Sequence, residues 1–541
     1  MKKSFKAIAK MLVHNISLAV GVIVLALLVF DGKELLASQI LDDFSQNHLS
    51  DYTVVDTWTA KGVGRFLYDA AGERLQVLTG DDIGLQFGRG LSASSAGVLQ
   101  FDFLPTAKHP NGGIFNLVLR QDAGNYYLIS NRDGYGPGAV SKVVGGRVAE
   151  QVAFQGEYRQ NSAYQLKVSF SPAATVVEAF GEVLSLSGDA TPLAVQSFEV
   201  ELRQQDGYFD NIVFTNKPFI SIIAPVDNYL QGDDQLQVKA LAGNLQPGWG
   251  VQFTLMDGET SDVQIYSDFT EPFEYTFTNL LRDDYIVKAS VIDSELNPIP
   301  GDFTFDLKEP VGIGDYYVAF GASISNGYGD DITLDDISTD SRNVGGGYPP
   351  ILNDLLTAAK GYPHTIVNEG VGGEDSSDAL ARVYDVLAAH PQAQYFIILL
   401  GTNDSSSPYP TPSGLNQNGE LLSPDDSGYN GSYLDNMQQI IDAIITAGKI
   451  PILGKLPITF GPCSTCTPFP YPDEAARNLL IQEYNVVIDA LVAKNGIGID
   501  APDFYEYYRT NSDEFSDNLH PNGLGYQSMA GLWFDAIMAA P

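Results

Sequence analysis

Four short patterns near the C-terminus contain side chains that could catalyse ester hydrolysis. They read FGASIS (residues 320–325), NEGVGGEDS (368–376), GTND (401–404) and DNLHPN (517–522). A serine hydroxyl is too weakly acidic to attack an ester unaided, so it needs a base that accepts its proton. Histidine is the common base, and a carboxylate that orients its ring completes the set.

Only one histidine of this region has such a carboxylate close by in sequence. His364 enters a predicted strand and His390 ends a predicted helix, which are ordinary structural positions, whereas His520 follows Asp517 by three residues. We therefore predict that His520 is the base and that the Asp517 carboxylate holds its ring in the right tautomer.

The tetrahedral intermediate of acyl transfer also needs hydrogen-bond donors for its oxyanion. We predict that the backbone N–H groups of Ser323 and Gly373 and the side-chain amide of Asn403 supply them. From the residues alone, Gly370 and Gly372 compete with Gly373 for this role.

The periodicity around these patterns predicts how they are positioned. From residue 312 to 541, strand-like runs alternate with helical ones, which is typical of a parallel sheet covered by helices. Strands are expected near residues 316–320, 365–368, 395–400 and 450–454, and helices near 349–359, 378–389, 433–447 and 473–494. Three patterns then follow strand ends, the edge where open α/β sheets bind ligands.

In this order the four patterns resemble the SGNH (GDSL-type) hydrolases, which are exported esterases and lipases. The resemblance covers about 230 residues and implies a three-layer, flavodoxin-like α/β fold, no cofactor and no metal. It also implies that Ser323 is the nucleophile of a triad with His520 as the base and Asp517 as the third member. It favours Gly373, because the family glycine stands before an acidic residue, here Glu374. It departs at Ala322, where the family has an Asp that shapes the nucleophile turn. The α/β-hydrolase alternative is disfavoured, because residues 321–325 lack the last glycine of G-x-S-x-G.

Two β-rich regions precede this domain. Short alternating runs over residues 41–217 predict an antiparallel sandwich that resembles concanavalin-type and laminin G jelly rolls, many of which bind glycans. Stacking on sugar rings and burial in core or edge strands are alternative roles for its aromatic side chains Trp58, Tyr126, Tyr127 and Tyr135. Residues 218–311 predict a smaller immunoglobulin-like sandwich.

Residues 1–40 combine a basic head with an apolar stretch over residues 16–30, the pattern of an export signal. We expect a secreted or periplasmic protein whose N-terminal segment is either cleaved or kept as an inner-membrane anchor. In such an oxidising compartment, Cys463 and Cys466 are expected to form a local disulfide, with free thiols as the alternative.

The composition excludes several classes of protein. The 30 Lys and Arg against 67 Asp and Glu leave a net charge of −37, which repels nucleic acid. The 2 cysteines and 6 histidines, none in HExxH spacing, disfavour a zinc enzyme. Asp330, Asp331, Asp335 and Asp336 could hold calcium, but they lack the spacing of an EF-hand loop.

The sequence therefore predicts an exported serine ester hydrolase that removes O-acetyl or similar acyl groups from carbohydrate. A lipase or general carboxylesterase is the alternative among enzymes. A surface adhesin with an inactive hydrolase domain is the alternative from another class, and Ala322 and the two β-regions favour it.

Overall fold

The structure is a computed structural model of the 541-residue chain. It describes residues 39–540 except 43–47, 60, 62, 109–111, 135, 189–191, 259, 261, 406–409 and 462–473. The predicted export segment, Tyr135 and the pair Cys463 and Cys466 therefore lie outside the described residues. Among the residues that are described, no helix is both long and apolar enough to cross a membrane.

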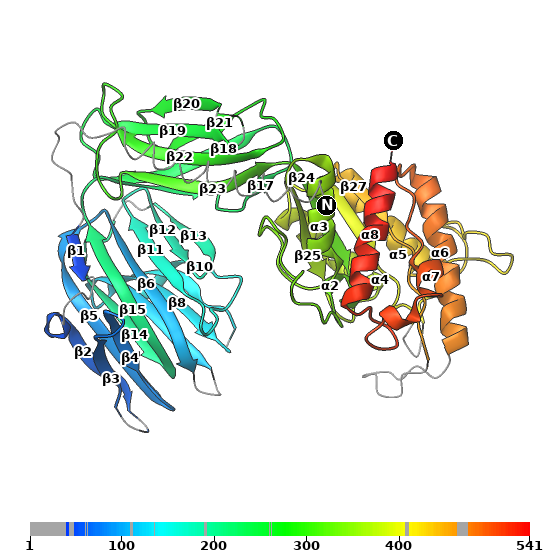
Figure 1. Cartoon of the computed structure of the whole chain (residues 1–541), viewed down its shortest axis with the longest axis horizontal. Coiled ribbons are helices and arrows are strands. Elements are labelled where there is room, and N and C mark those ends of the chain that lie inside the picture. Colours follow the sequence, from blue (N-terminus) through cyan, green and yellow to red (C-terminus); the bar gives the residue numbers. More distant parts are fainter. Residues whose placement is uncertain are drawn as a thin grey trace, which may run out of the picture.

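The first β-region consists of two antiparallel sheets that share one hydrophobic core (Figure 1). The eight-stranded sheet contains β1 (Gln39–Asp42), β3 (Arg65–Asp69), β4 (Arg74–Leu78), β6 (Gly97–Lys108), β11 (Tyr164–Phe170), β12 (Ala174–Ala179), β13 (Glu182–Ser187) and β15 (Gln205–Thr215). The seven-stranded sheet contains β2 (Thr53–Thr59), β5 (Ile83–Ser94), β7 (Gly113–Asp122), β8 (Asn125–Asp133), β9 (Ala139–Val144), β10 (Arg147–Ala153) and β14 (Val195–Arg203). A short 3-10 helix, η1 (Leu49–Asp51), precedes β2.

Alternation along the strands places the apolar side chains inside. In β14, Phe198, Val200 and Leu202 are fully buried, whereas Glu199 and Glu201 between them face outward. The same alternation decides the aromatic side chains of β8. Tyr127 is only 3% exposed and belongs to the core, so stacking on a sugar is excluded for it. Its neighbour Tyr126 points the other way, and the Arg120 guanidinium lies 5.0 Å from its ring centre.

The second β-region is smaller and also antiparallel, apart from one short parallel pair. A three-stranded sheet holds β16 (Phe219–Ala224), β18 (Leu236–Gly243) and β21 (Phe273–Phe277). A five-stranded sheet holds β17 (Leu230–Gln231), β19 (Gly250–Asp257), β20 (Val263–Asp268), β22 (Asp284–Ile292) and β23 (Phe305–Ile313). The jelly-roll and immunoglobulin-like assignments, and the predicted domain boundaries, stay predictions.

The C-terminal region is an α/β domain with a parallel sheet in the order β25-β24-β26-β27. Its strands are β24 (Asp315–Gly321), β25 (His364–Gly370), β26 (Tyr395–Leu399) and β27 (Ile450–Leu453). Its helices are α2 (Ser323–Asn326), α3 (Tyr348–Lys360), α4 (Ser376–Ala389), α5 (Tyr433–Thr446), α6 (Glu474–Asn495), α7 (Phe504–Tyr508), η2 (Ser512–Glu514) and α8 (Gly523–Ala539). The strands and helices expected from the periodicity all lie within a few residues of these bounds.

The strand order explains why helices cover both faces of this sheet. The chain steps from β24 to β25 in one direction and then crosses back over β24 to β26. Because such crossovers are right-handed, α3 lies on one face and α4 and α5 lie on the other. Helix α8 packs against α3, where Trp533 contacts Tyr348, and α6 packs against α5 (Figure 1). The order of the strands reverses at β24, so its carboxyl end is the expected ligand site.

Polar contacts join the second β-region to the amino end of the parallel sheet. Arg282 Nη1 lies 2.9 Å from Asp315 Oδ1 at the start of β24, and Gln394 beside β26 donates to the carbonyl of Gly232. Another ion pair joins Arg342, whose side chain is only 1% exposed, to Asp284 of β22. The carboxyl ends of the strands lie at the opposite edge of the sheet.

A second set of contacts joins the two β-regions to each other. The Lys308 ammonium of β23 lies 2.7 Å from Glu178 Oε2 of β12, and Ser169 Oγ lies 2.7 Å from Ser221 Oγ. Both serines are buried, and Val98, Val176 and Phe219 form a small apolar cluster between the regions. These contacts hold the second β-region between the first one and the α/β domain.

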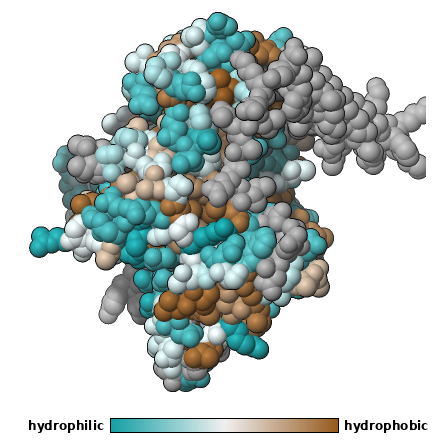
Figure 2. All heavy atoms as spheres, turned by 90° about the vertical axis from the view of Figure 1, so that its left-hand side faces the viewer, coloured by the Kyte–Doolittle hydropathy of each residue, from teal (hydrophilic) through white to brown (hydrophobic). Residues whose placement is uncertain are grey.

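The end of the first β-region that carries β2 and β3 has apolar surface. Val54, Val55 and Leu67 are 40%, 49% and 38% exposed on these strands. Figure 2, which faces that side of the molecule, shows apolar patches separated by hydrophilic surface. The separation agrees with the acidic composition, because charged side chains keep apolar patches small.

Candidate active site

Ser323 lies at the carboxyl end of β24, on the tight turn that leads into α2. Ala322 is the N-cap of this short helix, and Asn326 N–H donates to the Ala322 carbonyl at 3.0 Å. The neighbouring strand presses against the turn, since a Cβ on Gly370 would lie 2.3 Å from Asn326 N. Only glycine permits this close approach, which places the second sequence pattern directly beside the serine.

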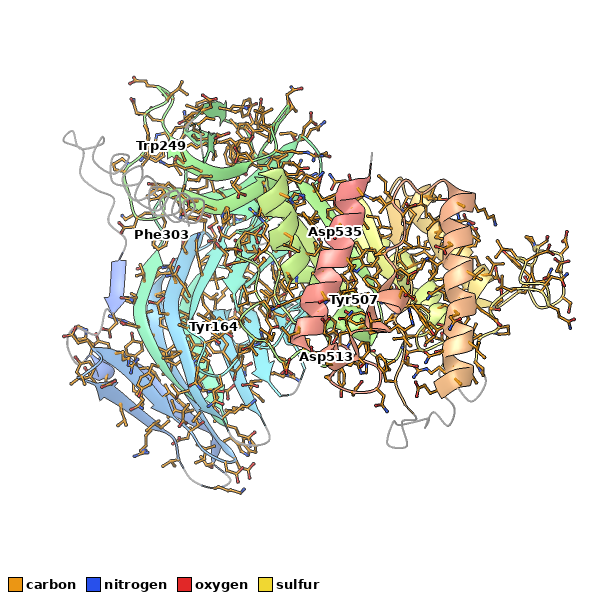
Figure 3. The ribbon with its side chains drawn as sticks, turned by 45° about the vertical axis from the view of Figure 1, so that its right-hand side comes forward. Tyr164, Trp249, Phe303, Tyr507, Asp513 and Asp535 are labelled. Carbon is orange, nitrogen blue, oxygen red and sulfur yellow. The ribbon has the colours of Figure 1, made fainter. Side chains whose placement is uncertain are left out.

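His520 and Asp517 lie on the loop that leads into α8. Asp517 Oδ1 accepts hydrogen bonds from the N–H groups of Leu519 and His520, each at 2.7 Å, so the carboxylate folds back on its own turn. Asn522, two residues after His520, is the N-cap of α8, and its side chain donates to the carbonyl of Asp513 at 3.0 Å. Figure 3 shows Asp513 at this end of α8. The local turn and the cap together fix where the imidazole lies.

The three predicted triad residues form one hydrogen-bonded chain. His520 Nε2 lies 2.9 Å from Ser323 Oγ, and His520 Nδ1 lies 2.8 Å from Asp517 Oδ2. Burial by itself would raise the pKa of Asp517, but hydrogen bonds from the His520 ring and from two backbone N–H groups outweigh it and lower that pKa. The carboxylate therefore stays ionised, and it favours the tautomer in which Nδ1 carries the proton and Nε2 faces the serine.

The three predicted oxyanion donors come from the turn after β24 and from the loops that follow β25 and β26. Gly373 has a φ of +87° and is exposed on the loop between β25 and α4. No described residue accepts a hydrogen bond from the N–H of Gly373 or of Ser323. Asn403 Nδ2 donates to the Glu374 carbonyl at 2.7 Å, which leaves its second hydrogen for a substrate oxygen. The assignment of these three groups as oxyanion donors stays a prediction.

Residues 319–528 match the model of the GDSL-like Lipase/Acylhydrolase family. The C-terminal region contains a GDSL-like lipase/acylhydrolase domain. This finding agrees with the predicted resemblance and with the parallel sheet. A comparison with curated proteins found no match to the chain.

Solved structures similar to parts of the chain include hydrolases and one β-protein. A lipase/acylhydrolase from Enterococcus faecalis is 21% identical over 41% of this chain and 95% of its own, with a TM-score of 0.28. A catalytic mutant of an acetylxylan esterase from Geobacillus stearothermophilus is 18% identical over 41% of this chain and 94% of its own, with a TM-score of 0.30. A Bacillus subtilis protein of unknown function with a galectin-like fold is 12% identical over 34% of this chain and 96% of its own, with a TM-score of 0.26.

The departure at Ala322 has a structural explanation within the GDSL-like domain. The Ala322 side chain is 6% exposed and packs in the core of the domain. The carbonyl of the preceding Gly321 accepts from Val371 N–H at 3.0 Å and from Arg382 Nη2 at 3.2 Å. The turn is therefore held through its backbone, without a carboxylate at position 322.

Asp404 belongs to the third pattern, but the sequence analysis assigned no role to it. Its carboxylate accepts from Ser376 N–H at 2.9 Å and from Ser376 Oγ at 2.5 Å, at the start of α4. Burial raises the pKa of Asp404 to about 6, and the nearby charge of Asp375 acts in the same direction, against the hydrogen bonds from Ser376. The pattern Gly-Thr-Asn-Asp was visible, but the burial that gives Asp404 its importance was not.

The acidic residues considered for calcium are only partly together. Single carboxylate oxygens of Asp330, Asp335 and Asp336 lie within 4.8 Å of one another. Asp331 instead accepts from the N–H of Gly523 at 2.9 Å, which ties its loop to the start of α8. Burial raises the pKa of Asp336, and so do the charges of Asp330 and Asp335. These contacts give no geometry that selects calcium, and the sequence prediction of no metal stays a prediction.

We predict that Asp404→Asn changes how stability depends on pH. The folded pKa of about 6 exceeds the unfolded value of 3.8, so the contribution of Asp404 is fully present below about pH 4. It is lost as pH rises through 6, by about 3 kcal/mol for about two pKa units. The free energy of unfolding, measured from pH 4 to 7, should therefore fall more steeply for the parent than for Asp404→Asn. A difference between the two proteins that stays constant with pH would contradict this.

Proposed function

We propose that the GDSL-like domain hydrolyses carboxylic esters through an acyl-serine intermediate. The observation that carries this proposal is the chain of hydrogen bonds from Ser323 Oγ through the His520 ring to Asp517. In this order, the imidazole can accept the proton of the hydroxyl, and the carboxylate can orient the imidazole and stabilise its positive charge, which activates the serine as a nucleophile.

In the first half of the proposed reaction, Ser323 Oγ attacks the ester carbonyl carbon while His520 Nε2 accepts the hydroxyl proton. The carbonyl oxygen becomes an oxyanion and accepts hydrogen bonds from the N–H groups of Ser323 and Gly373 and from Asn403 Nδ2. The intermediate collapses when the C–O bond to the alcohol breaks, and His520 returns the proton to the departing alcohol. In the second half, water repeats these steps on the acyl-serine and releases the acid.

An O-acyl carbohydrate is the substrate class that we propose, and Tyr328 supports it. The Tyr328 ring is 62% exposed, and its centre lies 4.6 Å from the centre of the His520 ring. Its backbone is held on both sides, because its N–H donates to the Ser323 carbonyl at 3.0 Å and its carbonyl accepts from the Tyr526 hydroxyl at 2.8 Å. An exposed, fixed aromatic face beside the reacting atoms suits stacking on a sugar ring.

The surface charge also supports a neutral substrate. The chain carries a net charge of −37, which repels anionic lipid surfaces and free fatty acids. Glycan binding by residues 41–217 is part of the same proposal. With Tyr127 buried and the Tyr126 ring beside Arg120, Trp58 on the edge strand β2 is the remaining described aromatic candidate of the original set.

A lipase or general carboxylesterase is the second candidate, because apolar side chains are also exposed near the site. Val371, on the loop that leads to Gly373, is 41% exposed, and Leu524, at the start of α8 after His520, is 58% exposed. Exposed apolar side chains at these two positions suit contact with an acyl chain.

We expect the parent protein to react with a fluorophosphonate probe at one serine per chain, and Ser323→Ala to lose the label completely. His520→Ala should lower kcat on p-nitrophenyl acetate by about 10³-fold or more, because the hydroxyl then lacks its base. Mass spectrometry of the labelled peptide and steady-state kinetics provide the measurements. Absence of label from the folded parent protein would favour the adhesin alternative.

We expect Tyr328→Ala to raise KM for an acetylated oligosaccharide about 3- to 10-fold while KM for p-nitrophenyl acetate stays within about twofold. Tyr328→Phe keeps the ring and is the matched control, which should behave like the parent on both substrates. Equal losses of Tyr328→Ala on both substrates would show that the ring orients His520 and does not bind sugar. A parent protein that prefers long-chain esters would favour the lipase alternative.

Export, with the N-terminal segment either cleaved or kept as an anchor, is also a proposal and is supported by residues 1–40 alone. We expect the protein to leave the cytoplasm of an expressing bacterium. Cell fractionation followed by intact-mass measurement tests this: a mass lowered by the first 37 or so residues indicates cleavage. A full-length protein found only in the cytoplasm would contradict export.

A further inference from the structure

One guanidinium group outside all four sequence patterns contacts two of them directly and reaches a third through Glu374. Arg382 lies in α4, eight residues after Glu374, and its side chain reaches back toward the start of the helix. Arg382 Nε donates to both carboxylate oxygens of Glu374, at 2.8 and 2.7 Å. The side chains of Arg382 and Glu374 are only 17% and 14% exposed. This ion pair is therefore shielded from solvent, and the shielding strengthens the attraction between the two charges.

The same guanidinium also holds the ends of two strands. Arg382 Nη2 donates to the Gly321 carbonyl at 3.2 Å and to the Glu369 carbonyl at 2.8 Å. Gly321 ends β24 two residues before Ser323, and Glu369 lies at the end of β25. The guanidinium carbon lies 4.5 Å from the centre of the Phe320 ring, a cation–π contact that fixes its plane.

Because Arg382 holds Glu374, it also restrains two of the predicted oxyanion donors, the backbone N–H of Gly373 and the side-chain amide of Asn403. Glu374 follows Gly373 directly, so holding its carboxylate limits how the Gly373 N–H is oriented. Its own carbonyl accepts from Asn403 Nδ2 at 2.7 Å, which orients the Asn403 amide. The loop therefore has two anchors, because Asp404 holds Ser376 on the other side of Glu374.

An outer pair of residues supports the Arg382 side chain. Arg382 Nη1 lies 3.7 Å from Glu369 Oε2, and Glu369 Oε1 lies 2.8 Å from His390 Nε2. His390 Nδ1 in turn lies 3.0 Å from the Tyr316 hydroxyl. His390, which stands at an ordinary structural position by sequence, thus belongs to a polar chain that runs from Tyr316 through Glu369 to Arg382.

We propose that Arg382 is a positioning residue for the oxyanion site, and that it sets the Gly373 N–H and the Asn403 amide relative to Ser323. It touches no reacting atom and acts through Glu374 and the backbone carbonyls of Gly321 and Glu369. The proposal rests on the ester hydrolysis proposed above. Because oxyanion donors act mainly in the transition state, loss of this restraint lowers kcat more than it changes KM.

The test uses the full-length protein with p-nitrophenyl acetate. Arg382→Gln should lower kcat about 10- to 100-fold with KM within about twofold, since small misplacements of catalytic groups cost rates of this size. A trifluoromethyl ketone forms an oxyanion when it adds to the serine. Its inhibition constant should therefore rise by the same factor by which kcat/KM falls. The stoichiometry of fluorophosphonate labelling should stay at one per chain, because the triad is intact.

Further variants separate positioning from folding. Arg382→Lys can still pair with Glu374 and should recover part of the kcat that Arg382→Gln loses. If Arg382→Gln yields too little folded protein, the kcat of Arg382→Lys tests whether Arg382 positions the oxyanion donors. Glu374→Gln should lower kcat by less, and the double variant should lose less than the product of the single losses. Arg509→Gln removes an arginine that pairs with Glu506 on the exposed surface of α7 and should match the parent protein.

Two results would overturn the proposal. One is a kcat within twofold of the parent in folded Arg382→Gln. The other is a labelling stoichiometry that falls in proportion to kcat, which would make Arg382 a folding residue only. Failure of the proposed ester hydrolysis looks different, because the parent protein itself would then show neither labelling nor turnover.

Discussion

The hydrogen bond between Ser323 and His520 joins residues that are 197 positions apart in sequence, and the rest of the site depends on it. It requires that the carboxyl end of β24 and the loop before α8 meet. Helix α8 is placed by its packing on α3, where Trp533 contacts Tyr348, and its start is tied to the loop after α2 by Asp331. The catalytic geometry is therefore a product of the whole α/β domain.

Two carboxylates of the GDSL-like domain show how environment divides chemically identical groups. Asp517 receives hydrogen bonds from the His520 ring and two backbone N–H groups, which lower its pKa despite partial burial. Asp404 is more deeply buried, and that burial raises its pKa to about 6 although Ser376 donates to it twice. Asp517 is suited to hold a charge beside an imidazole, while Asp404 is suited to anchor a loop.

The second β-region is attached to the α/β domain at the amino end of the parallel sheet. Arg282 and Gly232 of the second β-region contact Asp315 and Gln394 at the amino ends of β24 and β26. The seven residues of β24 span six rises of about 3.3 Å, or about 20 Å, and Ser323 lies beyond the far end of this strand. The attachment and the candidate site therefore lie at opposite edges of the parallel sheet.

The sequence by itself determined the α/β class of the C-terminal region and identified the residues of the proposed triad. Alternation of strand and helix periods is a local property, and Asp517 and His520 are near enough in sequence for one turn to pair them. Only the tertiary structure decided which tyrosine of β8 faces the core, because adjacent residues of a strand point to opposite faces and the register selects between them. It also decided the partners of Arg382, the burial of Asp404 and the place of Tyr328 beside the His520 ring, because each depends on segments that meet only after folding.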